Sequence, residues 1–168
     1  MLTLTHPAVA VAVDALAGAD EDLTPVAAVE RDDVVAVLVY GERSRTVVFV
    51  RDIDGVWTPP GIVIGSGRPN RARNEFTLAE QPIQRLTRKS HARPLPDGSP
   101  EPIGWCAVTG IAARDAVGVA VSSSLEQQAA TIEEDGLVFV VLRALTDETP
   151  QVVVHLADGR AIEARGVS

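Results

Sequence analysis

The stretch VAAVERDDVVAVLVYGERSRTVVFVRDIDGVW, residues 26 to 57, decides the fold class. Valine-rich runs in it are separated by short reversals that contain Asp, Ser or Gly, which is typical of strands joined by tight turns. The run from Val34 to Tyr40 is apolar on both faces, so it should be a central strand that is covered on both sides. The predicted strands are Val26 to Glu30, Val34 to Tyr40, Arg45 to Arg51 and Val56 to Thr58.

A similar pattern follows 82 residues later, in Val108 to Phe139. At this offset Val26 aligns with Val108 and Asp33 with Asp115, and alternating valines align in the run that follows each aspartate. Asp54-Gly55 aligns with Asp135-Gly136 after a slip of one residue. This order predicts an internal repeat and therefore two related β units.

The C-terminal part of the chain has several short strand patterns in fewer than seventy residues, which favours a sandwich or a small barrel. An immunoglobulin-like arrangement is one form of such a sandwich. The clearest turn is Asp158-Gly159, between two strand patterns of similar length. The fold class that we predict is mainly β, with two related antiparallel units, and the alternative is a single α+β domain. The predicted strands here are Ile103 to Thr109, Ala116 to Val121, Ala129 to Ile132, Leu137 to Ala144, Val152 to Leu156 and Ala161 to Ala164.

The N-terminal residues 7 to 17 favour a short helix, because Pro7 suits a first turn and Val9, Val13 and Leu16 share one face. An edge strand is the competing interpretation, since valine and alanine alternate here. No Lys or Arg precedes this apolar run, and Asp14 interrupts it too early for a membrane span. We therefore expect no membrane association, and a cytoplasmic chain if it is complete or an extracytoplasmic one if a leader was removed.

Residues 66 to 100 differ from the rest of the chain in charge. They contain seven basic and three acidic residues, whereas the whole chain has a net charge of -8. Their five prolines predict a long loop or linker, with one short helix from Pro82 to Lys89. The predicted organisation is thus a helix and β unit at 1–65, a basic insert at 66–100 and a second β unit at 101–168.

The sequence predicts no catalytic centre, metal site or cofactor. Its three histidines are not spaced as zinc ligands, and the acidic run Glu133 to Asp135 lacks the further oxygen ligands that calcium needs. Cys106 is the only cysteine, so no intrachain disulfide can form, and its apolar neighbours favour a small core residue over a nucleophile.

The leading hypothesis is therefore a non-catalytic interaction or assembly module, whose strand edges bind a protein partner or a second copy of the chain. Binding of nucleic acid or another polyanion by the basic insert is the first alternative. An enzyme that uses Asp52, Asp54 or His155 is the second. The candidate anion contacts are Arg68, Arg71, Arg73, Arg85, Arg88 and Lys89.

Overall fold

A computed structural model describes residues 1–69 and 72–165 and divides into two compact units, Met1–Asn70 and Arg71–Ser168. Twelve strands and one helix make up the described secondary structure. The prediction of a mainly β protein with antiparallel sheets and a short N-terminal helix is confirmed. The α+β alternative is wrong, because helix within residues 1–69 and 72–165 is restricted to the eight residues of α1.

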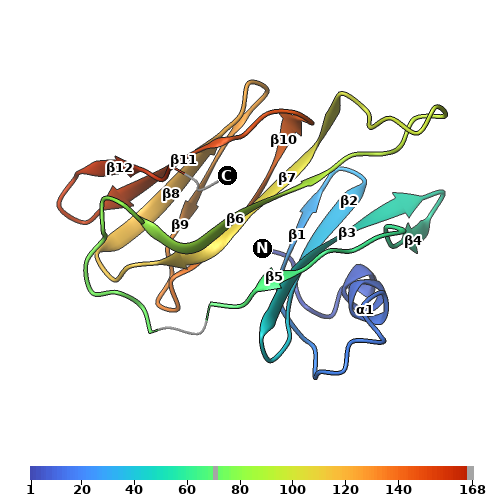
Figure 1. Ribbon diagram of the computed structural model, residues 1–168, viewed down its shortest axis with the longest axis horizontal. Helices are drawn as coiled ribbons and strands as arrows, with labels where there is room; N and C mark the ends of the chain where they lie inside the picture. The colour runs from blue at the N-terminus through green and yellow to red at the C-terminus, as the bar shows by residue number, and fades with distance from the viewer. Residues whose placement is uncertain (70–71, 166–168) are drawn as a thin grey trace. The chain divides into compact units, whose positions relative to one another are not determined.

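The first unit is an antiparallel meander in the order β1-β2-β3-β4, with β5 paired to the start of β3 (Figure 1). The turns fall at the acidic and glycine residues that the sequence indicates, and Asp32 and Asp54 adopt positive φ angles of 51° and 54° there. The strands are β1 (Thr24–Arg31), β2 (Val34–Tyr40), β3 (Ser44–Ile53), β4 (Val56–Thr58) and β5 (Ser66–Gly67).

Helix α1 (Pro7–Asp14) packs against one face of this sheet through Ala8, Val9 and Ala12. Pro7 occupies the first turn, where a missing N–H costs nothing, and Nδ1 of His6 accepts the N–H of Ala8 at 3.2 Å. The His6 ring also meets the Trp57 ring edge to face at 5.1 Å. The sheet contributes these buried side chains to the shared core: Ala28, Val35, Val37, Val39, Val48 and Val50.

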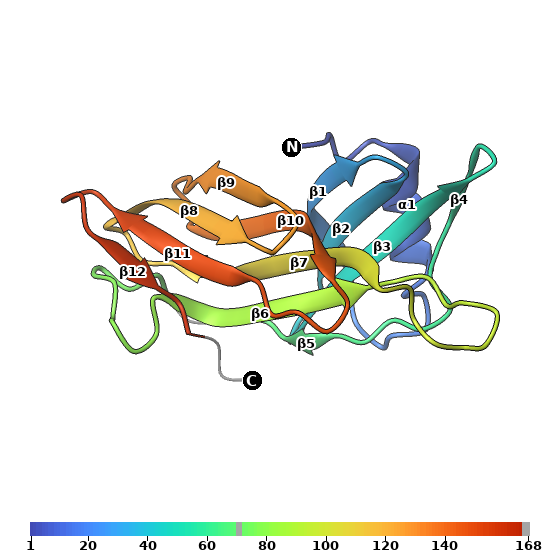
Figure 2. The same cartoon turned by 90° about the horizontal axis from the view of Figure 1, so that it is seen from above.

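The second unit is a sandwich of two antiparallel sheets, β10-β7-β6 and β12-β11-β8-β9 (Figure 2). Lettered A to G from β6 to β12, the sheets read E-B-A and G-F-C-D. This order resembles that of an immunoglobulin constant-type sandwich, except that strand D pairs with strand C and not with strand E. The strands are β6 (Ile83–His91), β7 (Ile103–Ala112), β8 (Ala116–Ser122), β9 (Gln127–Thr131), β10 (Leu137–Leu145), β11 (Gln151–Leu156) and β12 (Ala161–Glu163).

Branched aliphatic side chains from both sheets fill the interior of the sandwich. Val108 and Leu142 come from one sheet and Val121 and Val154 from the other, and none of the four is exposed. Each such side chain contributes about 1.5 to 3 kcal/mol when it leaves water, so this shared core is what holds the two sheets together.

Strand β6 is a correction to the sequence analysis. Pro82 to Lys89 was expected to form a helix, and the chain instead pairs with β7 from Ile83 to His91. The register shifts by one residue between Gln84 and Thr87, so a β-bulge lies there, with Arg85 at φ 53°. The segment 66–100 therefore supplies β5 to the first unit and an edge strand to the second, and only the remainder is loop.

The two copies of the repeat do not pair in the same way, which corrects the prediction of related units. At the offset of 82, β2 coincides with β8 and most of β1 with β7. However, β1 and β2 are hydrogen-bonded neighbours, whereas β7 and β8 lie in different sheets. The shared valine pattern thus records strands of similar length, and it does not fix their partners.

No helix in the described ranges has the length and apolar character that would let it cross a membrane.

Candidate interaction edge

Arg73, one of the predicted anion contacts, is an internal clamp in the second unit. Its guanidinium donates to four main-chain carbonyls: Ala112 at 2.9 Å, Ala113 at 2.7 Å, Glu134 at 2.5 Å and Glu133 at 3.5 Å. These carbonyls belong to the last residue of β7, to the β7–β8 connection and to the β9–β10 connection. Arg73 therefore ties two loops at one end of the sandwich.

Arg88 has a similar role at the β6 edge. Its Nε donates to the carbonyl of Pro150 at 2.9 Å, and one terminal nitrogen donates to the carbonyl of Ala164 at 3.2 Å. In the first unit, Arg68 donates to the carbonyl of Gly41 at 3.0 Å and lies 4.8 Å from the centre of the Tyr40 ring. These guanidinium groups already have internal hydrogen-bond acceptors.

The remaining predicted contacts are Arg85, Lys89 and Arg71. Arg85 is exposed at the bulge of β6, and Lys89 is half-buried, with its pKa lowered by desolvation. Arg71 lies outside the described residues. Polyanion binding by this segment stays a prediction that the structure does not test.

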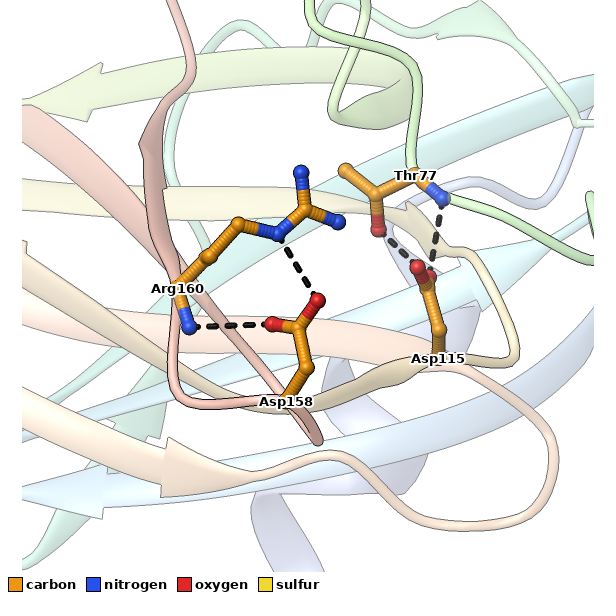
Figure 3. Close-up of polar contacts among 4 residues, drawn as sticks. All are labelled: Thr77, Asp115, Asp158 and Arg160. Atoms are coloured by element: carbon orange, nitrogen blue, oxygen red, sulfur yellow. Dashed lines mark hydrogen bonds and ion pairs between the residues drawn. The ribbon is translucent and has the colours of Figure 1, made fainter.

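Carboxylates at the loops of the second unit order the turns (Figure 3). Oδ1 of Asp115 accepts both the N–H and the hydroxyl of Thr77, at 2.8 and 2.7 Å. Asp158 accepts the main-chain N–H of Arg160 at 3.0 Å and its Nε at 2.8 Å, and these contacts, the main-chain bond first, lower the pKa of Asp158. Both carboxylates thus have local structural roles.

The other candidates for chemistry are similarly placed in structural positions. Asp52 accepts the N–H of Gly55 at 2.7 Å in the β3–β4 turn, and His155 lies on β11 between β8 and β12. Cys106 is buried, and desolvation raises its thiol pKa to about 11, which opposes reactivity at neutral pH. Within residues 1–69 and 72–165, no three His, Cys, Asp or Glu side chains are grouped to hold a metal ion.

A small hollow lies beside the β6 bulge, lined by Glu80, Ile83, Arg85 and Ala164 among others. Its volume is about 160 Å³. Pockets that enclose a drug-sized ligand have volumes of roughly 300 to 1,000 Å³. The hollow is therefore too small to be a ligand pocket of that kind.

The sheet edges are more informative, because most of them carry features that prevent pairing with another strand. In the first unit, β1 contains Pro25 and a register shift, and its Ala28 carbonyl accepts the N–H of Leu2 at 2.9 Å. In the second unit, β6 has a bulge and cationic side chains. Strands β4 and β12 have three residues each, too few for a stable new ladder.

The edge of strand β10 is also blocked against strand addition, because side chains from outside the strand bind its main-chain groups. The N–H of Arg143 donates to the carboxylate of Glu126, and its carbonyl accepts the hydroxyl of Ser123 at 2.6 Å. The N–H of Leu145 donates to Glu148 at 3.0 Å. The end of this edge is thus occupied within the chain.

Strand β9 is the exception. Its sequence, QQAAT, has no charge, no proline and no glycine, and its pairing with β8 has no register shift. It ends its sheet, and β8 is its only strand partner in the part of the chain that the structure describes. The side chains of Gln127, Ala129 and Thr131 are exposed, while those of Gln128 and Ala130 are partly buried.

The hydrogen-bond pattern shows which main-chain groups of β9 point away from the sheet. The main-chain carbonyl of Glu126 accepts the N–H of Ser123 at 2.9 Å, and the N–H of Ile132 donates to the main-chain carbonyl of Val117 at 3.0 Å. Residue pairs in an antiparallel ladder are alternately hydrogen-bonded and non-hydrogen-bonded. In this register the main-chain groups of Gln128 and Ala130 therefore bond to β8. The N–H and C=O groups of Gln127, Ala129 and Thr131 therefore point away from β8, and these three are called the outward residues of β9.

The hairpin that carries this edge is held firmly. Glu148 accepts the N–H of Ser124 at 2.5 Å and its hydroxyl at 3.0 Å, in addition to the N–H of Leu145. The Leu145 bond, followed by those from Ser124, lowers the pKa of Glu148, so the carboxylate stays ionised at neutral pH. Glu148 thereby fixes the β8–β9 turn to the end of β10.

Sequence reasoning identified strand edges as binding surfaces but did not select β9. The available signal was the absence of charge and proline over residues 127 to 131, which becomes meaningful only when the strand is known to end a sheet. Comparison with known proteins gives no further guide, because no protein-family model, curated protein or solved structure matches the chain.

Proposed function

We propose that this protein is a non-catalytic interaction module that binds a partner chain by adding a strand to the β9 edge. The observation that carries the proposal is the contrast between β9 and the other sheet edges, which are short, bulged, proline-containing or occupied. Edges without such features are templates for another strand. Strand addition is a recurring mode of protein recognition.

The geometry supports recognition of an extended main chain. Three outward residues, Gln127, Ala129 and Thr131, each supply one N–H and one C=O, so an antiparallel partner can form six main-chain hydrogen bonds. Each such bond contributes about 0.5 to 1.5 kcal/mol net, and the anchored hairpin pays little ordering entropy. The edge is therefore suited to weak binding that depends little on the partner's side chains.

Photo-crosslinking in cells of the source organism tests the proposal. A photoreactive amino acid at Thr131 reports on the edge, and the same group at His155 is the matched control, since His155 is exposed on the same sheet but lies on an interior strand. We expect Thr131 to label an extended segment of one defined chain and His155 to label none. Equal labelling from the two positions, or none from either, would contradict the proposal.

A further inference from the structure

The β9 edge is complementary to itself, and we propose that its partner is a second copy of this chain. In the proposed dimer, β9 pairs antiparallel with β9 of the second copy, with Ala129 opposite Ala129. The two four-stranded sheets then form one continuous sheet of eight strands. This inference rests on the proposed function and names the occupant of the same edge.

The register follows from the main-chain groups. Outward N–H and C=O pairs lie at positions 127, 129 and 131, which are symmetric about 129. An antiparallel ladder centred on Ala129 places Gln127 opposite Thr131 of the second copy, and Thr131 opposite its Gln127. All three positions become hydrogen-bonded pairs, whereas a shift of the centre by one residue toward either end leaves at least one of them without a partner.

The side chains agree with this register. The exposed side chains of Gln127 and Thr131 would lie side by side across the new ladder, where the amide and the hydroxyl can exchange a hydrogen bond. Acidic residues flank β9, but extending the same register places Glu126 opposite Ile132 and Glu133 opposite Leu125 of the second copy. No like charges are therefore directly opposed, despite the net charge of -8.

Symmetry also favours a second copy over an open assembly. Antiparallel pairing of two identical edges about a two-fold axis uses both edges completely, so it closes at a dimer. The strand is only five residues long. The contact area is correspondingly small, and we expect a weak dimer with a Kd of about 10⁻⁵ to 10⁻³ M.

Sedimentation equilibrium of the full chain from about 10 μM to 1 mM tests the inference, with Ala129→Lys as the main variant. This substitution places two lysines directly opposite each other in the dimer, and like charges at that position oppose pairing. Thr131→Lys is the matched control. It makes the same change of charge on the same exposed face, but its lysine lies opposite Gln127.

We expect the wild type and Thr131→Lys to dimerise with Kd values within about threefold of each other, and Ala129→Lys to weaken dimerisation at least tenfold. Mixing Ala129→Lys with Ala129→Glu should restore a dimer that contains one copy of each, which also shows that both variants are folded. A wild type that remains monomeric at 1 mM, or an Ala129→Lys variant that dimerises like the wild type, would overturn the inference. If Thr131 crosslinks to another protein while the wild type is monomeric, the proposed function stands and self-pairing fails.

Discussion

Gly110 of β7 lies opposite the β-bulge of β6, and a Cβ atom at this position would overlap Cγ2 of Ile83. The same Cβ would lie 3.0 Å from the carbonyl oxygen of Gln84 and 3.4 Å from Cα of Leu86. The bulge brings the β6 backbone so close to β7 that only glycine fits between them. The conformation of one strand thus depends on the absence of a side chain in the next.

Gly110→Ala should therefore destabilise the second unit by about 1 to 3 kcal/mol, because the added methyl group displaces the bulge or the Ile83 side chain. Gly118→Ala is the control, since Gly118 is also in a strand but its nearest neighbour would be 3.6 Å from the new Cβ. Urea unfolding followed by circular dichroism should show a lower midpoint for Gly110→Ala only. Equal midpoints for the two variants would mean that the close approach has no energetic consequence.

Sequence reasoning predicted a helix in β6 because Pro82 suits a first helical turn and Arg88 and Lys89 suit a last one. The bulge also conceals the period of two that would have indicated a strand. Ile83 and Leu86 both pack toward the core, although they are three residues apart. An extra residue in the strand puts them on one side, and the spacing of three then resembles the period of a helix. The regular strands β2 and β8 were easier to recognise, and both were predicted within one residue of their observed ends.

Strand partners were harder to predict than strands. The valine pattern of Val35, Val37 and Val39 recurs in Val117, Val119 and Val121, although Val117 is exposed and the other five valines are buried. Alternation reports the faces of a strand and carries no information about which strand lies beside it. For the same reason the β9 edge was not identifiable before the order of the sheet was known.

Arg73 should be important for stability, even though its charge suggested a binding role. Arg73→Met removes hydrogen bonds to four carbonyls and should lower the free energy of unfolding by about 2 to 4 kcal/mol. Arg160→Met is the control, because Arg160 forms an exposed ion pair with Asp158, a type of contact worth about 0 to 1 kcal/mol. Thermal unfolding of both variants measures the difference, and similar losses would show that Arg73 is not a clamp.

Cys106 should make the folded chain less stable at alkaline pH. Its thiol ionises near pH 11 in the folded state because burial disfavours the thiolate, whereas the ordinary thiol pKa is 9.0. As the pH rises, the unfolded state therefore loses this proton before the folded state does. The stability that the buried neutral thiol contributes is fully present below pH 9 and is lost as the pH rises to about 11. The loss is on the order of 3 kcal/mol.

Urea midpoints at pH 8 and pH 10.5 measure this effect when the wild type is compared with Cys106→Ala. Other groups that titrate in this range are common to both proteins, so the difference between their pH dependences reports Cys106. We expect the wild type to lose more stability than the variant. Parallel pH profiles would show that the thiol is not desolvated in the folded chain.

The basic segment provides the last prediction. Arg88 donates to the carbonyls of Pro150 and Ala164, so replacing it confounds binding with stability. The test of polyanion binding therefore changes Arg85 and Lys89, and the unfolding midpoint of the double variant is measured beside that of the wild type. We expect the wild type to show no binding to a labelled 20-nucleotide single strand at about 0.15 M salt, because the net charge of -8 opposes association. Fluorescence anisotropy measures this directly. Binding that weakens steeply with salt and disappears in the Arg85→Ala, Lys89→Ala double variant would instead establish a polyanion site on β6. Salt screening and the loss of two phosphate contacts both reduce the same electrostatic attraction.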